Sequence, residues 1–181
     1  MMRRDRRNPC RMRRNDAIGR NSVATYTGSC FCGAIRYRLE SGPMFVHCCH
    51  CRDCQRQTGS AFAVNAIIET DRITLMPGEV EPEAIEMKTD SGRPHDIYRC
   101  PRCQSALWSD YGRRGVVRFV RVVTLDDPSA LPPDVHIFTR SKLDWVVLPP
   151  GARAFEVYYD TKREWPAESL ARREALLGPL R

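Results

Sequence analysis

The 181-residue sequence has no long hydrophobic run, and no apolar segment follows its basic N-terminus. A membrane-spanning helix needs roughly 18 apolar residues in a row, so the sequence excludes a protein of that kind. A secretory signal needs an apolar region behind its charged start, so we expect a cytoplasmic protein that is not exported. The chain also lacks a strand–helix–strand unit, which argues against a parallel nucleotide-binding sheet.

Lysine is scarce, and the positive charge is concentrated at one end. Only three of the 29 basic residues are Lys. The formal net charge is +7, of which residues 1–20 carry +6 and the other 161 residues carry +1. Aliphatic residues are rare in this tail, so residues 1–21 are predicted to be disordered. The nearly neutral remainder does not favour nucleic acid as a partner, except nonspecifically through the tail.

Residues 22–150 are predicted to form a mainly β domain. Short segments rich in β-branched and aromatic residues alternate with turns rich in Gly, Pro, Ser and Asp. In residues 151–181 we expect an extension with a short helix at Pro166–Leu177, because Pro suits a first turn and Gly178 a stop. The expected strands are Ala34–Leu39, Ala61–Ile68, Ile73–Met76, Ile97–Cys100, Ala106–Ser109, Gly115–Val123 and Val135–Phe138.

Nine cysteines carry the strongest chemical signal. In a chain without an export signal, clustered cysteines favour metal binding over disulfides. Cys30 and Cys32 place both sulfurs on one face of an extended chain, and Cys100 and Cys103 share a Cys-x-x-Cys turn. Four thiolates form the closed tetrahedral set of a structural zinc site. The alternative is two unrelated pairs of buried thiols.

A second group of cysteines follows in the next part of the chain. If residues 47–51 are extended, Cys49 and Cys51 share a face, and Cys54 returns to them through a Cys-x-x-Cys turn. Three protein ligands with an open fourth position are typical of a catalytic zinc site. The side chains that would close this site by supplying a fourth ligand are those of His47, Cys48 and His50.

Other interpretations of this segment stay open. If Cys48 is not a ligand, we expect it to be a buried thiol on the opposite face of the strand. Cys51 and Cys54 also have the spacing of a redox dithiol, although neighbouring cysteines on a strand have poor geometry for a disulfide. Arg52 and Arg56 flank the cluster and would favour thiolates.

The ordered motifs resemble the glutathione-dependent formaldehyde-activating enzyme family, which includes centromere protein V. Order and spacing agree over about residues 24–149. The matching segments are Gly28–Gly33, Cys49–Gly59, Tyr98–Cys103, Thr124–Pro128, His136–Phe138, Lys142 and Trp145.

The resemblance implies a compact Mss4-like, or β-tent, fold of short antiparallel sheets. It implies two zinc ions per chain, a structural one on the first four cysteines and a catalytic one on Cys49, Cys51 and Cys54. The named activity of the family joins glutathione and formaldehyde into S-hydroxymethylglutathione and is classed as a carbon–sulfur lyase. The chain departs from the family at Gln104, where Gly is usual. Since Gly there often supports a left-handed turn, we expect Gln to strain the loop.

The expected function is therefore that of a zinc-dependent lyase acting on a glutathione-type thiol and a small aldehyde. Arg52 and Arg56 are candidate contacts for the carboxylates of the thiol. Two other functions stay open, because a fold does not fix a function. One is a non-catalytic zinc-binding module with a basic tail, and the other is a thiol redox or metal-buffering protein.

Overall fold

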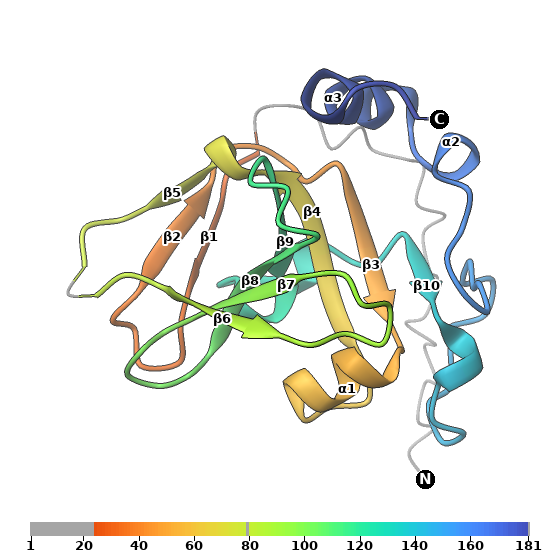
Figure 1. The fold of residues 1–181 in the computed structure, drawn as a ribbon, viewed down its shortest axis with the longest axis horizontal. Coiled ribbons are helices and arrows are strands. Elements are labelled where there is room, and N and C mark those ends of the chain that lie inside the picture. The colour runs from red at the N-terminus through yellow and green to blue at the C-terminus, as the bar shows by residue number, and fades with distance from the viewer. Residues whose placement is uncertain (1–23, 79, 181) are drawn as a thin grey trace, which may run out of the picture.

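Two β-sheets form the body of the molecule, and Figure 1 shows the smaller one beside the larger. The structure is a computed structural model that describes residues 24–78 and 80–180, so the tail predicted at residues 1–21 lies outside it. The prediction of a mainly β fold is confirmed. The smaller sheet has the order β1 (Tyr26–Ser29), β2 (Arg36–Leu39) and β5 (Ile73–Leu75). The larger sheet has the order β10 (Val135–Ile137), β3 (Phe45–Cys49), β4 (Ala63–Glu69), β9 (Val117–Arg121), β8 (Ala106–Tyr111), β7 (His95–Arg99) and β6 (Glu83–Met87).

The main hydrophobic core lies between the two sheets. Strand β2 alternates exposed arginines with the fully buried Tyr37 and Leu39, which is the period of two that a half-buried strand requires. Trp108 of the larger sheet meets Tyr37 edge to face, with ring centroids 5.4 Å apart. Gly28 permits this packing, because a Cβ there would lie 2.6 Å from the Tyr37 ring and 2.6 Å from the Thr124 carbonyl oxygen.

The larger sheet has an apolar face and a more polar face. Strands β3, β4 and β9 are antiparallel neighbours, so residues directly opposite one another form rows on one face. Successive rows point to opposite faces. The row of Val46, Ala66 and Val120 belongs to the main core, and the next row consists of His47, Asn65 and Arg121.

The seven expected strands are present with shifted ends, whereas β1, β3 and β6 have no counterpart among them. Strand β6 is polar and mostly exposed, so it lacks the hydrophobic pattern that identifies a strand. The expected sheets are antiparallel, but β10 pairs with β3 in parallel. The 85 or so residues between these strands include most of both sheets, so no local pattern reveals the pairing.

In the described part of the chain, three α-helices lie at the edges of the sheets: α1 (Arg52–Thr58), α2 (Thr161–Glu164) and α3 (Ala167–Leu177). The helix expected at Pro166–Leu177 is confirmed as α3, which begins after Pro166 and ends at Gly178. A second apolar cluster with Met44, Phe45 and Trp165 packs against Leu170 of this helix. Residues 24–78 and 80–180 also contain four 3-10 helices: η1 (Thr70–Arg72), η2 (Val122–Thr124), η3 (Pro128–Ala130) and η4 (Thr139–Ser141).

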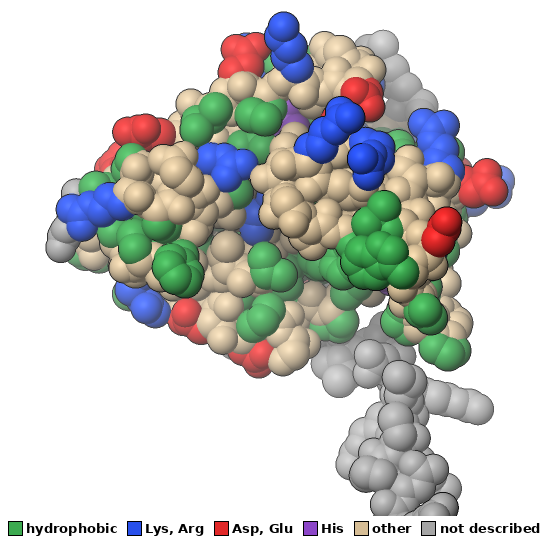
Figure 2. Space-filling view, turned by 90° about the horizontal axis from the view of Figure 1, so that it is seen from below, with side chains coloured by type: hydrophobic (Ala, Val, Ile, Leu, Met, Phe, Trp, Pro, Cys, Tyr) green, Lys and Arg blue, Asp and Glu red, His purple; other side chains and the backbone are tan. Residues whose placement is uncertain are grey.

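Charge is mixed on the face that Figure 2 shows. Lys and Arg side chains alternate there with acidic and hydrophobic ones and do not form one continuous basic area. Among the described residues, no helix combines the length and the apolar character that crossing a membrane requires.

Candidate metal centres and the adjoining cavity

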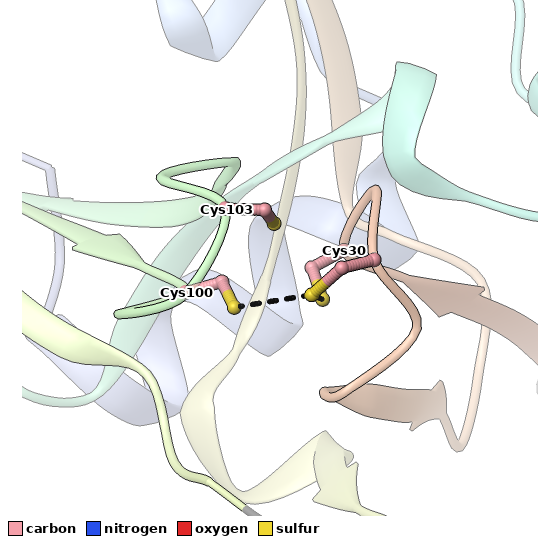
Figure 3. Close-up of side chains that lie close together, drawn as sticks. Cys30, Cys100 and Cys103 are labelled. Carbon is pink, nitrogen blue, oxygen red and sulfur yellow. Dashed lines mark hydrogen bonds between the residues drawn. The ribbon is translucent and has the colours of Figure 1, made fainter.

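The first cysteine group joins two loops that are far apart in the sequence. Figure 3 shows Cys30 on one loop facing Cys100 and Cys103 on the other. The sulfur of Cys32 lies 3.6 Å from that of Cys30 and 3.9 Å from that of Cys100, and all four sulfurs lie within 4.8 Å of one another. Zinc–sulfur bonds of about 2.3 Å in a tetrahedron separate the sulfurs by roughly 3.8 Å. This donor set therefore fits a closed zinc site.

Both loops have the tight backbone that such a site needs. The amide of Ile35 donates a hydrogen bond to Cys30 Sγ at 3.3 Å, which orients that sulfur. The other loop reverses at Gln104, whose φ of 61° lies in the left-handed region that favours glycine. The Gln104 side chain donates to the Pro101 carbonyl at 3.1 Å, and Arg99 donates to the Gln104 carbonyl at 2.8 Å. These contacts hold an unfavourable backbone conformation in place.

The second group brings together the sulfurs of Cys49, Cys51 and Cys54 within 4.8 Å of one another. The chain is extended up to Cys51, and the Cys49 and Cys51 sulfurs lie 3.4 Å apart on one face of it. Cys54 returns toward Cys51 in the first turn of helix α1, which starts at Arg52. Cys51 caps this helix, and its sulfur accepts a hydrogen bond from the Cys54 amide at 3.4 Å.

The three thiols of this group have strongly unequal pKa values. Hydrogen bonds from Cys49 and Cys54, together with the backbone amides of Cys54 and Asp53, hold the pKa of Cys51 far below its usual range. The same pairing raises the pKa of Cys49, because that thiol donates to the Cys51 sulfur. A metal ion bound by these three cysteines would displace the protons of their thiols.

None of the three residues considered as a fourth ligand joins this group. Cys48 and His50 lie on the other face of the strand, where His50 Nε2 is 3.6 Å from Cys48 Sγ and 3.1 Å from His136 Nδ1. These three donors lie within 4.8 Å of one another. However, the buried Nδ1 of His50 has no hydrogen-bond partner in the described part of the chain, whereas the second nitrogen of a metal-bound His normally donates. The contacts fit packed, hydrogen-bonded side chains better than a metal site.

A cavity of about 730 Å³ lies against the three-cysteine group. All three cysteines line it, whereas none of the first four cysteines does. The polar row of His47, Asn65 and Arg121 forms part of its wall, and arginines outnumber carboxylates there. The charged residues that line the cavity are Arg52, Arg93, Arg114, Arg121, Arg140, Arg173, Asp53 and Asp90.

Comparison with known proteins agrees with the cysteine pattern. The profile of the glutathione-dependent formaldehyde-activating enzyme family matches residues 25–141. The chain belongs to this family. A Halomonas elongata protein, provisionally named a glutathione-dependent formaldehyde-activating enzyme, is 32% identical over 158 residues, which cover 83% of this chain and 95% of that protein. A crystal structure of a Rhodobacter sphaeroides protein aligns with a TM-score of 0.41 and 18% identity, over 71% of this chain and 98% of that one.

In this member of the formaldehyde-activating family, the C-terminal residues beyond the matched segment complete the cavity wall. Trp165 Nε1 donates a hydrogen bond to Tyr159 Oη at 2.6 Å, and Tyr159 Oη bonds to His47 Nε2. An indole nitrogen only donates, so the Tyr159 oxygen is the acceptor in its contact with Trp165. Burial lowers the pKa of His47 to about 3, so the ring is neutral.

Of the two arginines proposed from the sequence, one lines the cavity and the other does not. Arg52 lines the cavity, and its guanidinium bonds to Gln55. Arg56 instead lines a separate surface depression with Phe62 and Trp145. The arginines at positions 93, 114, 140 and 173 come from loops and helices far along the chain, and no local spacing links them to the cysteines.

Proposed function

We propose that this protein is a zinc-dependent carbon–sulfur lyase that joins a glutathione-type thiol to a small aldehyde. The observation that carries the proposal is the position of the three-cysteine group at the wall of a cavity with a positively charged lining. Membership of the family supports the choice of substrates. The four-cysteine group lies outside the cavity and is proposed to hold a second, structural zinc ion.

The reaction is an addition without oxidation or reduction. The sulfur of the thiol forms a bond to the aldehyde carbon, the carbonyl π bond breaks, and the thiol proton ends on the new hydroxyl oxygen. When bound to Cys49, Cys51 and Cys54, a zinc ion would supply Lewis acidity that lowers the pKa of a thiol or polarises an aldehyde.

The chain's own residues would bind and orient the substrates. Arg114, Arg140 and Arg173 line the cavity and are suited to binding the carboxylates of a thiol such as glutathione through charge-assisted hydrogen bonds. The apolar side chains of Ile67 and Phe119 face the same space and limit access of water. An anionic thiol would thus be held with its sulfur near the three cysteines.

The test combines zinc counting with turnover of glutathione and formaldehyde. We expect two zinc ions per chain in the metal-replete protein and one in Cys51→Ser, which should also lose formation of the thiol adduct. Cys48→Ala is the matched control, because Cys48 lies beside the ligand Cys49 on β3 but points to the other face, so this variant should keep both ions and the activity. A Cys51→Ser protein with one zinc ion and undiminished turnover would exclude the proposed role.

A further inference from the structure

Arg121 is a buried cation in contact with neutral groups. Only 3% of its surface is exposed. Its guanidinium donates to the amide oxygen of Asn65 and, at 3.2 Å, to that of Gln57, while its Nε has no partner among the described residues. Among the described residues, no Asp or Glu carboxylate lies at ion-pair distance from the Arg121 guanidinium. A buried charge is costly unless an opposite charge compensates it.

The opposite charge next to Arg121 belongs to the three-cysteine group. Arg121 lines the same cavity as these cysteines. The pairing of β9 with β4 places Arg121 opposite Asn65, on the face of the large sheet that borders the cavity. Burial lowers the pKa of Arg121, and negative charge on Cys54 and Cys49, when these thiols are deprotonated, acts in the opposite direction. The geometry places them together: Cys49 is two positions from His47 on β3, so it lies on the same face as the row of His47, Asn65 and Arg121, and all line one cavity.

The charges balance when a divalent ion is bound. Three thiolates carry −3 and a zinc ion carries +2, so the loaded group has a net charge of −1. One guanidinium neutralises it. We propose that Arg121 is a positioning residue that serves as the fixed counter-charge of the three-cysteine metal group and stabilises its loaded form. The inference rests on the proposed function, in which these cysteines hold zinc.

The experiment measures zinc affinity at the three-cysteine group of the full chain by competition with a chromophoric chelator. Removing a residue that supports metal ligands typically weakens metal binding 10–100-fold, and we expect a loss of about this size in Arg121→Gln. Arg121→Lys keeps the positive charge and should recover most of the affinity. If the Gln variant does not fold, Arg121→Met tests the same loss of charge with an apolar side chain of similar length.

Two controls separate a charge effect from general destabilisation. The four-cysteine group provides an internal reference, because its zinc affinity should be equal in every variant. Arg118→Gln is the matched substitution, since Arg118 also lies on β9 but pairs with Asp110 at 2.8 Å and does not line the cavity. It should leave the affinity of the three-cysteine group unchanged.

The outcomes distinguish this inference from the proposed function. If the unaltered protein binds no zinc at the three-cysteine group, the proposed function fails and the inference fails with it. If the unaltered protein binds zinc there and Arg121→Gln binds it equally well, only the inference fails. Equal losses in Arg121→Lys and Arg121→Gln would also overturn it, because charge would then not be the cause.

Discussion

Glu69 and Arg172 join the end of β4 to helix α3 through two contacts. Arg172 Nη2 lies 2.6 Å from Glu69 Oε2, and Arg172 Nε lies 2.7 Å from Oε1. Arg172 also donates to the carbonyl of Gly42 at 3.1 Å. Glu69 is only 4% exposed, and its buried carboxylate is compensated by Arg172 and by Arg72, whose Nε lies 3.4 Å from Oε1. A helix outside the family segment is thus attached to the large sheet by a nearly buried ion pair.

Replacing this carboxylate should make the stability of the protein less dependent on pH. Burial acts to raise the pKa of Glu69, but the Arg172 guanidinium outweighs it and holds the pKa below its ordinary value. The ion pair therefore stabilises fully above the unfolded pKa of about 4.3, and this contribution is lost as the pH falls through the lower folded value. We expect Glu69→Gln to cost about 1.5–3 kcal/mol at pH 7. Urea unfolding at pH 7 and pH 3 measures the difference, and an equally large cost at pH 3 would contradict the assignment.

Removal of a ligand from the first cysteine group should destabilise the whole fold. Cys100 is fully buried, and its group connects the two loops that close the main core. We expect Cys100→Ser to lose one zinc ion and more than about 4 kcal/mol of unfolding free energy. Cys51→Ser should lose a zinc ion with a much smaller change. Elemental analysis combined with thermal unfolding compares the two, and a reversed order would refute the division into structural and catalytic groups.

Gln104 occupies a backbone conformation that glycine adopts more easily. With φ at 61°, a non-glycine residue there costs roughly 1–2 kcal/mol. Gln104→Gly removes this cost and loses one exposed side-chain hydrogen bond, so we expect a gain of about 0.5 kcal/mol. Gln104→Val keeps the cost and adds a β-branched side chain, so it should be less stable than the natural protein. Unfolding midpoints that rank Val above Gly would disprove this.

Gly28 should not tolerate even a methyl group. Its added Cβ would lie 2.6 Å from the backbone oxygen of Thr124, which cannot move aside as a flexible side chain can. Overpacking of this kind costs about 1–3 kcal/mol, and we expect Gly28→Ala to be destabilised by that amount. Ser29→Ala on the same strand is the control and should change stability little. Chemical denaturation of both variants checks the expectation, which fails if they unfold alike.

The parts of the site that follow from local spacing were predictable. An extended segment places Cys49 and Cys51 on one face by alternation alone, and the structure has this geometry. Helix α1 was missed because its first turn begins at a cysteine cap and carries no run of apolar residues. The contact between His47 and Tyr159 spans 112 positions and depends on the path of the whole chain. Arg121 has no motif around it, and only the register of β9 with β4 directs it to the cavity.

The two cysteine pairs of the four-cysteine group are far apart in the sequence, so the ribosome synthesises one pair well before the other. Sixty-eight positions separate Cys32 from Cys100. A ribosome adding 5–20 residues per second needs roughly 3–14 seconds to cover that distance. Throughout this interval the first cysteine pair has been made while its partner pair has not. The apolar face of β2 also lacks its packing partner during this interval, because Trp108 is synthesised after Cys100. The nascent chain must therefore keep its thiols reduced and its first sheet free of other contacts until the second half arrives.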